Sequence, residues 1–330
     1  MQHLGLARLS HSGRYALSSC VAAAMLAGCG GSQPPIGVLG AAPQTSAVAR
    51  HADRGKSWML PEAKSKDLLY VSTSDSVYVF SYPKGTLVGT LTGFDYPRGL
   101  CSDRLGNVWV ANASTESGEG YLVEYAHGGM TPIATLSDTG ESPVACSIDP
   151  STGNLAAANC PDRDCASTVA IYARAQGTPT QIPTGPVWGP FEITYDNSGN
   201  IFVAAEIDFF DHKIGWLPNG QSQFQIFTME PKTLSSGNVA WDGTYVAVLK
   251  KRDRIHRYTI VSGHGQAAGP AVLLDGCCGY SPMLIKGSTF ISAYGNNVSF
   301  WHYPQGGASF KSISVPEAPY GVAVSVASSR

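Results

Sequence analysis

The chain has 330 residues, and a closed all-β fold can use that length as a single domain. Charged residues make up only 14% of the chain, against a usual share of about 25%, which favours turns and an uncharged surface. Residues 1–28 contain Arg8 and Arg14 and no acid, so their removal changes the net charge from −2 to −4. A mildly acidic chain lacks the basic face of a nucleic-acid-binding protein, and we expect no nucleic-acid partner.

The amino terminus has the pattern of an export signal. Arg8 and Arg14 precede the apolar run 16–27, which is too short to span a membrane. The run ends in Leu26-Ala27-Gly28-Cys29, which resembles the lipobox of bacterial lipoproteins. This resemblance implies cleavage before Cys29, acylation of its thiol and anchoring to a membrane. The alternative is an ordinary signal peptide in which Cys29 is incidental.

We expect three segments along the chain: a lipoprotein signal peptide over 1–28, the lipidated Cys29 with a flexible tether over 29–65, and a folded domain over 66–330. Residues 30–65 are rich in Gly, Ala, Ser and Pro and lack hydrophobic periodicity, which is typical of a tether. Residue 30 is not an aspartate, so in a cell with two membranes we expect the outer one to hold the anchor.

A strand–turn–strand motif repeats through the folded domain. Its turns are marked by aspartates 46, 47 and 46 residues apart: Asp103, Asp149, Asp196 and Asp242. Asp accepts backbone N–H groups at a turn, a following Gly supplies positive φ, and alternating apolar residues flank both. The spacing is typical of propeller blades.

A second motif, an aromatic residue before a turn rich in Pro, Gly or Asn, recurs six times, with Leu replacing the aromatic residue once. Its first residues are Tyr82, Tyr125, Tyr172, Leu217, Tyr258 and Tyr303. Each unit of about 45 residues is therefore predicted to be a four-stranded antiparallel meander that packs against its neighbours. We predict an all-β, six-bladed β-propeller.

The two ends of the domain complement each other. The first unit, 67–91, lacks an opening strand, and the carboxyl-terminal run 319–326 resembles one without partners. We therefore expect the C-terminal strand to close the first blade, which would remove exposed sheet edges.

The best copy of the repeat, Pro97 to Ala111, resembles the NHL-repeat family, and the resemblance extends over about residues 66–326. It implies a six-bladed propeller. Similar rings include gluconolactonase-like hydrolases, quinoprotein sugar dehydrogenases and peptidyl-hydroxyglycine lyases, so the fold alone does not give the function.

In such a meander the Asp turns share one end, and the other end collects the longer, more varied connections. We call the second end the loop-rich face and expect a ligand there. Its candidate residues are Tyr96, Arg98, Trp188, Glu206, Asp208, Phe209, Phe210, Asp211, His212, Tyr280, Tyr294 and Tyr320. The run 206–212 is the foremost candidate, because acids beside aromatics suit a hard cation or a sugar-like ligand. The alternative is a solvated loop whose aromatics pack locally.

A metal site is the weaker possibility. Gluconolactonase-like enzymes hold a divalent cation with carboxylates and Asn side chains at the channel mouth, and the resemblance offers Glu141, Glu192, Asn238 and Asn296 for Ca²⁺ or Zn²⁺. No spacing specifies this cluster. A lyase-like zinc site needs convergent histidines, and only His212 falls on the loop-rich face.

Six cysteines remain beyond Cys29, an even number that favours disulfides in an exported protein. Cys160 and Cys165 would close a short ring worth roughly 2 kcal/mol. Cys101 and Cys146 lie in the innermost strands of adjacent blades but differ by one residue in register, so they either pair or are buried thiols. We interpret the neighbouring Cys277 and Cys278 as a structural pair.

We therefore expect a monomeric, noncatalytic module without a cofactor, anchored in the bacterial cell envelope, that binds a protein, peptide or glycan. The main alternative is a divalent-metal-dependent hydrolase of the lactonase type. A quinoprotein is a third hypothesis, although the sequence has no visible motif for the quinone.

Overall fold

A computed structural model describes residues 56–113, 120–160, 167–208, 211–230, 237–250, 253–278 and 281–328, with the backbone alone for 207, 208 and 211. The chain divides into two compact units, Met1–Pro43 and Gln44–Arg330, and all described residues belong to the second. None of the helices in the described part is long and apolar enough to cross a membrane.

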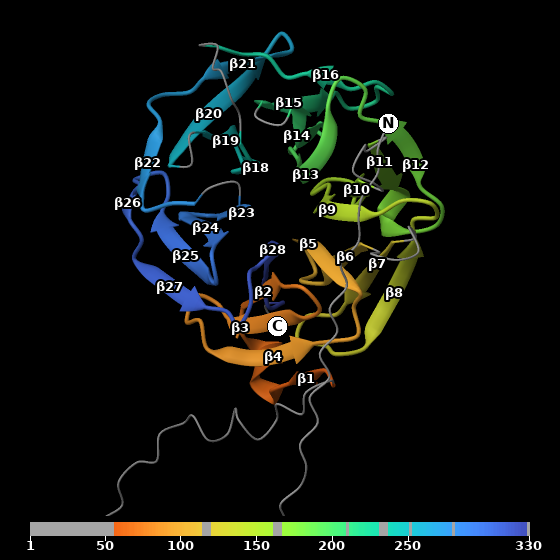
Figure 1. The fold of residues 1–330 in the computed structure, drawn as a ribbon, viewed down its shortest axis with the longest axis vertical. Coiled ribbons are helices and arrows are strands. Elements are labelled where there is room, and N and C mark those ends of the chain that lie inside the picture. Colours follow the sequence, from red (N-terminus) through yellow and green to blue (C-terminus); the bar gives the residue numbers. More distant parts are fainter. Residues whose placement is uncertain are drawn as a thin grey trace, which may run out of the picture. The chain divides into compact units, whose positions relative to one another are not determined.

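Within the described residues the strands form six sheets, numbered here from the amino terminus (Figure 1). Sheet 1 contains β1 (Trp58–Met59), β2 (Leu68–Ser72), β3 (Val77–Ser81), β4 (Leu87–Leu91) and β28 (Gly321–Ser325). Sheet 2 contains β5 (Tyr96–Ser102), β6 (Val108–Ala113), β7 (Tyr121–Tyr125) and β8 (Pro132–Ser137). Sheet 3 contains β9 (Pro143–Ile148), β10 (Leu155–Asn159), β11 (Thr168–Tyr172) and β12 (Thr180–Pro183).

Sheet 4 contains β13 (Trp188–Tyr195), β14 (Ile201–Asp208), β15 (Asp211–Leu217) and β16 (Gln225–Ile226). Sheet 5 is built on β18 (Val239–Trp241), β19 (Val246–Lys250), β20 (Arg254–Val261) and β21 (His264–Ala267), with β17 (Met229–Glu230), β22 (Val272–Asp275) and β26 (Gly307–Ala308) added. Sheet 6 contains β23 (Met283–Lys286), β24 (Thr289–Tyr294), β25 (Asn297–His302) and β27 (Lys311–Ser314).

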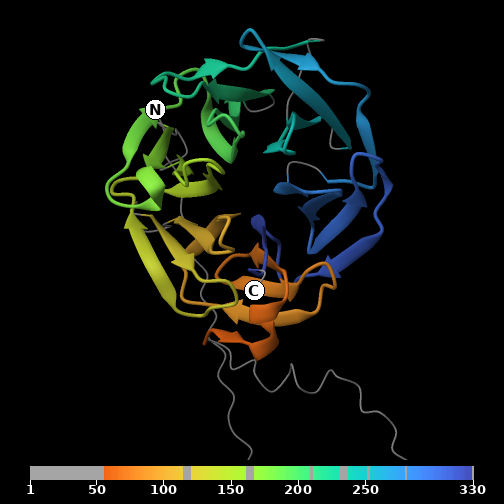
Figure 2. The same ribbon diagram turned by 180° about the vertical axis from the view of Figure 1, so that it is seen from behind.

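The sheets surround a common centre like the blades of a propeller (Figures 1 and 2). The strands nearest the centre are β28, β5, β9, β13, β18 and β23, which we call the inner strands. The prediction of an all-β chain with four-stranded antiparallel blades in a β-propeller arrangement is confirmed.

The carboxyl-terminal strand β28 pairs with β2 along its whole length, from Ser325 opposite Leu68 to Gly321 opposite Ser72. Its side chains Val322, Ala323 and Val324 are buried. Because β28 follows sheet 6 in the chain and pairs within sheet 1, it joins the two ends of the domain.

The tether prediction was wrong for its last residues. Trp58 and Met59 form β1, which pairs antiparallel with β4, and a short 3₁₀ helix, η1 (Pro61–Ser65), follows. Ala63 is fully buried in this helix. The outer edge of β4 offers unpaired backbone groups, so a segment without hydrophobic periodicity can still join the sheet.

The Asp turns have the predicted hairpin structure. Asp103 Oδ1 accepts the Leu105 and Asn107 N–H groups, each at 2.8 Å, and the Asn107 side chain donates to Oδ2 at 2.9 Å. Asp196 makes the same three bonds in sheet 4. In the Asp103 turn, Gly106 lies between Leu105 and Asn107 and has φ +85°, a conformation that favours glycine. These aspartates therefore fix strand ends and fix the inner strands in register.

Candidate functional site

A cavity of about 160 Å³ lies among the inner strands, and all six contribute to its wall. Glu192, on β13, is the one charged residue among the described residues that line it. The Glu192 residue is partly accessible from the cavity. Its carboxyl group nevertheless lies deep among protein atoms. As far as the structure describes the chain, the central cavity is therefore mainly uncharged and holds a single carboxyl group.

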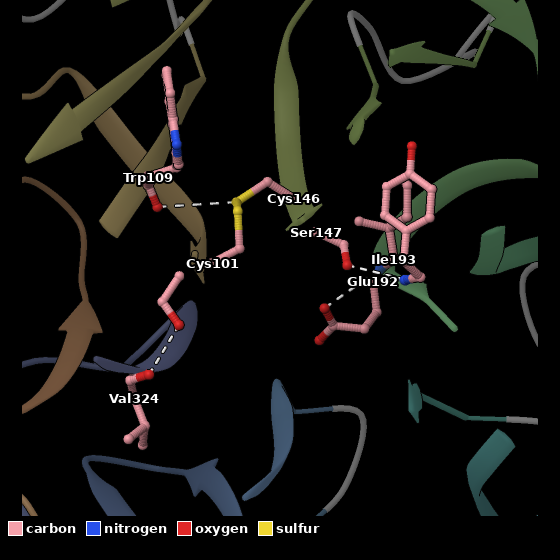
Figure 3. The surroundings of a disulfide bond; sticks show 9 residues. Cys101, Trp109, Cys146, Ser147, Glu192, Ile193 and Val324 are labelled. Atoms are coloured by element: carbon pink, nitrogen blue, oxygen red, sulfur yellow. Dashed lines mark hydrogen bonds between the residues drawn. A yellow bond between two sulfur atoms is a disulfide. The ribbon is translucent and has the colours of Figure 1, made fainter. Parts of the chain in front are cut away.

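The environment of Glu192 favours its neutral form. Burial raises the pKa of its carboxyl from 4.5 to about 8, against the opposing effect of the Ile193 and Met283 backbone N–H groups. The Ile193 N–H donates to Glu192 Oε1 at 3.4 Å (Figure 3). Near pH 7 the carboxyl group is mainly protonated, so it can donate as well as accept a hydrogen bond.

In sheets 3 and 4, the side chain two residues before the turn aspartate connects one inner strand to the next. Ser147 Oγ accepts the Tyr195 N–H at 3.0 Å, and Thr194 Oγ1 accepts the Trp241 N–H at 3.2 Å. These bonds join sheet 3 to sheet 4 and sheet 4 to sheet 5. The wall of the cavity is therefore held by side-chain hydroxyls bonded to the backbone of the following sheet.

At the corresponding position of sheet 2, Cys101 forms a disulfide with Cys146 of sheet 3 (Figure 3). Their Cα atoms are 5.6 Å apart, within the usual range for a disulfide. Gly99 keeps the strands close here, since a Cβ at this residue would collide with the Ala145 backbone. The junction between sheets 2 and 3 is therefore covalent.

The one-residue difference in register is what allows this pair. Cys101 lies opposite Trp109, and Cys146 lies opposite Ala157, and all four belong to one apolar cluster between the two sheets. Adjacent sheets pack face to face, so two side chains meet only when they leave their strands on opposing faces. The one-residue offset between Cys101 and Cys146 left their pairing open in the sequence. In the structure this offset is what places the two side chains on facing sides of sheets 2 and 3.

At the loop-rich end of the inner strands, three predicted residues come together. The Arg98 guanidinium lies over the Tyr96 ring at 4.9 Å and over the Tyr320 ring at 4.7 Å, and Nη1 donates to the Tyr96 hydroxyl at 2.8 Å. The two rings meet edge to face at 5.3 Å. The hydrogen bond with Tyr96, and then burial, raise the pKa of Tyr320. We call this group the Tyr–Arg–Tyr cluster.

A second group lies on sheet 4. His212 is buried, and its Nε2 is 3.7 Å from Glu206 Oε1. Glu206 is opposite Trp188 in the register, and the His212 ring meets Phe191 edge to face at 5.4 Å. Two residues of the run 206–212, the foremost candidate from the sequence, thus form a packed pair within sheet 4.

The comparisons with known proteins indicate the fold alone. No protein-family model matches the chain, and no curated protein matches its sequence. Among solved structures, one titled as a nidogen/laminin complex is similar with a TM-score of 0.61 at 14% identity, covering 80% of this chain and all of that one. A protein of unknown function from Bacteroides caccae is similar with a TM-score of 0.57 at 11% identity, over 79% of this chain and 99% of that one.

Several predicted site residues are not tested by the structure. Cys29, Cys165, Phe209, Phe210 and Tyr280 lie outside the described residues, and the side chains of Asp208 and Asp211 are not described. Tyr294 is described and is 62% exposed at the end of β24. The lipidation of Cys29, the disulfide of Cys165 and the ligand-face roles of the other residues stay predictions.

The four weak metal candidates occupy different places. Glu192 lines the central cavity, whereas Glu141 lies in the connection between β8 and β9. Asn238 is buried and its amide donates to the Ser281 carbonyl, while Asn296 is exposed. Within the described ranges, no three His, Cys, Asp or Glu side chains are grouped to hold a metal ion.

The remaining cysteines agree in part with the sequence. Cys160 belongs to a disulfide, and its predicted partner lies outside the described residues. The sulfur atoms of Cys277 and Cys278 are in contact at the end of sheet 5. Both disulfide pairings stay predictions, which mapping of the disulfide-linked peptides would test.

Sequence reasoning missed two polar residues near the loop-rich end of sheet 3, Asp138 and Asn159. Both are fully buried. One signal was available for Asn159, because it occupies the same repeat position as Asn112 in sheet 2. For Asp138 the sequence carried no signal, since its burial depends on β10 to β12 folding against it.

Proposed function

We propose that this protein is a binding module that recognises a protein, peptide or glycan at its loop-rich face. The Tyr–Arg–Tyr cluster is the observation that carries the proposal. It joins the start of β5 to the residue before β28, so its members come from opposite ends of the domain. The arginine and tyrosine side chains of this cluster are partly exposed and already packed, so they lose little rotamer freedom when a ligand arrives.

The chemistry of the cluster suggests what the ligand presents. Guanidinium has five N–H donors, and one of those of Arg98 is used by Tyr96. Among the described residues no carboxylate forms an ion pair with Arg98. The two tyrosine rings hold the guanidinium in place and leave its other N–H donors for a planar anion, so we expect a ligand with a carboxylate group.

The test is an array of acidic and neutral peptides and oligosaccharides, probed with the wild type, Arg98→Ala and Arg98→Lys. We expect Arg98→Ala to lower affinity at least about tenfold, and Arg98→Lys to restore little because lysine lacks the planar fork.

Arg174→Ala is the matched control, because this arginine is exposed on η2 (Ala173–Ala175). It should bind like the wild type. Equal binding by wild type and Arg98→Ala, with equal melting temperatures, would count against the proposal. Equal losses of affinity in Arg98→Ala and Arg174→Ala would show that the net charge of the protein, and not the cluster, governs binding.

For the architecture, we propose that each of the six sheets is one blade and that β28 closes the ring as the innermost strand of the first. The pairing of β28 with β2 supports this proposal. A contact between β28 and the inner strand β5 adds to this support, because the Ser102 hydroxyl donates to the Val324 carbonyl at 2.9 Å.

For the location, we propose export and acylation at Cys29, with the anchor in the cell envelope. The support is the sequence Leu26-Ala27-Gly28-Cys29 behind an apolar run. Growth with labelled palmitate should label the wild type and not Cys29→Ser. Equal labelling of both would contradict the proposal. No observation favours the lactonase or quinoprotein alternatives, so neither is proposed.

A further inference from the structure

Three buried oxygen atoms without hydrogen-bond partners lie where sheets 2 and 3 meet at the loop-rich end. They are Asp138 Oδ2, Glu141 Oε2 and Asn159 Oδ1. Asp138 and Asn159 are fully buried as whole residues, and Glu141 is partly exposed. Buried polar atoms are nearly always paired, so three orphans of one chemical kind need an explanation.

The three side chains belong to one cluster. The Glu141 N–H donates to the Asp138 carbonyl at 2.9 Å, and the Asp138 charge acts on Glu141. Asn159 Nδ2 donates to Thr168 Oγ1 at 3.2 Å, and Thr168 in turn bonds the Glu141 carboxyl. The Asn159 side chain also interacts with the Asp138 carboxyl. Every member is thus linked to another.

The donors present do not neutralise the two acids. Gln181 Nε2 donates to Asp138 Oδ1 at 2.7 Å, but no cation pairs with either acid among the described residues. A buried carboxylate without a counter-charge is costly, and within the described ranges neither acid has a positive partner.

In sheet 2, the asparagine at the same repeat position has hydrogen-bond partners within the protein. Asn112, opposite Pro97, is the counterpart of Asn159, opposite Pro143. Asn112 Oδ1 accepts the Asp95 and Tyr96 N–H groups, each at 3.1 Å. In sheet 3 the incoming connection brings carboxylates in place of those N–H groups, and the amide oxygen stays unpaired.

We propose that Asp138, Glu141 and Asn159 form a binding site for a calcium ion. Carboxylate and amide oxygens are the ligands that Ca²⁺ prefers, and it tolerates an irregular set completed by water. Only two of the three side chains are acids, so the site differs from a purely acidic cluster. The partly exposed Glu141 gives the ion a route from solvent.

The test uses the full purified chain, freed of metal with EGTA and then given CaCl₂ or MgCl₂. Calorimetry should show one Ca²⁺ site, and the melting temperature should rise by several degrees with Ca²⁺ and much less with Mg²⁺. Asp138→Asn and Glu141→Gln should each weaken Ca²⁺ binding at least about tenfold. Glu124→Gln, which changes another partly buried acid on β7, should bind Ca²⁺ like the wild type.

The variants also test folding. In EGTA, Asp138→Asn should melt no lower than the wild type, because the change removes a buried unpaired charge. If that variant does not fold, Glu141→Gln, at a partly exposed position, carries the test. Absence of Ca²⁺ heat and of a melting shift in the wild type would overturn the proposal. So would equal effects of Mg²⁺, or wild-type affinity in both site variants.

Discussion

The junctions between neighbouring inner strands use one repeat position in different ways. Between sheets 2 and 3 this position holds Cys101, which forms a disulfide, whereas between sheets 3 and 4 it holds Ser147, which accepts one backbone N–H. In sheet 5 it holds Ala240, which has no side-chain donor or acceptor. The difference shows that equivalent places in a repeated fold can carry very different strengths of connection.

The pairing of β28 with β2 is expected to matter most. Deleting residues 319–330 removes β28 and its backbone pairing to β2. It also removes the buried side chains of Val322 and Val324, each worth about 1.5–3 kcal/mol, and the smaller buried Ala323. We expect a loss on the order of 5 kcal/mol or failure to fold. Thermal unfolding followed by circular dichroism measures this. An unchanged melting temperature would show that the ends of the domain do not depend on each other.

The covalent junction is next. Replacing Cys101 and Cys146 together by Ala opens a loop with a sequence separation of 45, which costs about 4 kcal/mol in the loop-entropy model. Denaturant unfolding measures the change. Replacing Cys277 and Cys278 is the control, because adjacent residues enclose almost no loop and should matter far less. Equal effects of both double variants would contradict the comparison between junctions.

Glu192 should make stability depend on pH. Its folded pKa of about 8 lies above the ordinary 4.5, so its contribution is fully present below pH 4.5 and is lost as pH rises through 8. Glu192→Gln should remove this fall and be more stable than the wild type at pH 8.5 by on the order of 2 kcal/mol. Denaturant unfolding at several pH values tests the sign. Parallel pH profiles of wild type and variant would refute it.

The hydroxyl junctions should have the smallest effects. Ser147→Ala and Thr194→Val each remove one side-chain acceptor for a backbone N–H, for which we expect about 1 kcal/mol. Thr131→Ala, at an exposed position, is the control and should change stability by less than about 0.5 kcal/mol. Losses as large as that of the Cys101–Cys146 pair would remove the distinction between the two kinds of junction.

The sequence predicted the repeating elements well, because blade spacing and turn chemistry are local properties. The Asp turns and the pairing of β28 with β2 have local or end-to-end sequence signals. The pairing of Cys101 with Cys146 was left open, since register on one strand does not reveal which faces two sheets present to each other. The disulfide was decided by packing in three dimensions.

The site was less predictable. Arg98 and Tyr320 were both candidates, but they are far apart in the chain, and Tyr320 reaches Arg98 because β28, which follows it, pairs with β2. Asp138 was missed because its burial depends on the strands of sheet 3. The last residues of the predicted tether formed β1 because β4 offered an open edge, a property of the sheet that the segment itself does not carry.

The most direct test of recognition at the loop-rich face places a photo-crosslinking residue, p-benzoylphenylalanine, at Tyr320 in the cells that produce the protein. Leu105, which is 70% exposed in an Asp turn at the opposite end, is the matched position. We predict a discrete crosslinked product from position 320 that Arg98→Ala weakens, and none from position 105. A product from position 105 alone, or none from either, would contradict it.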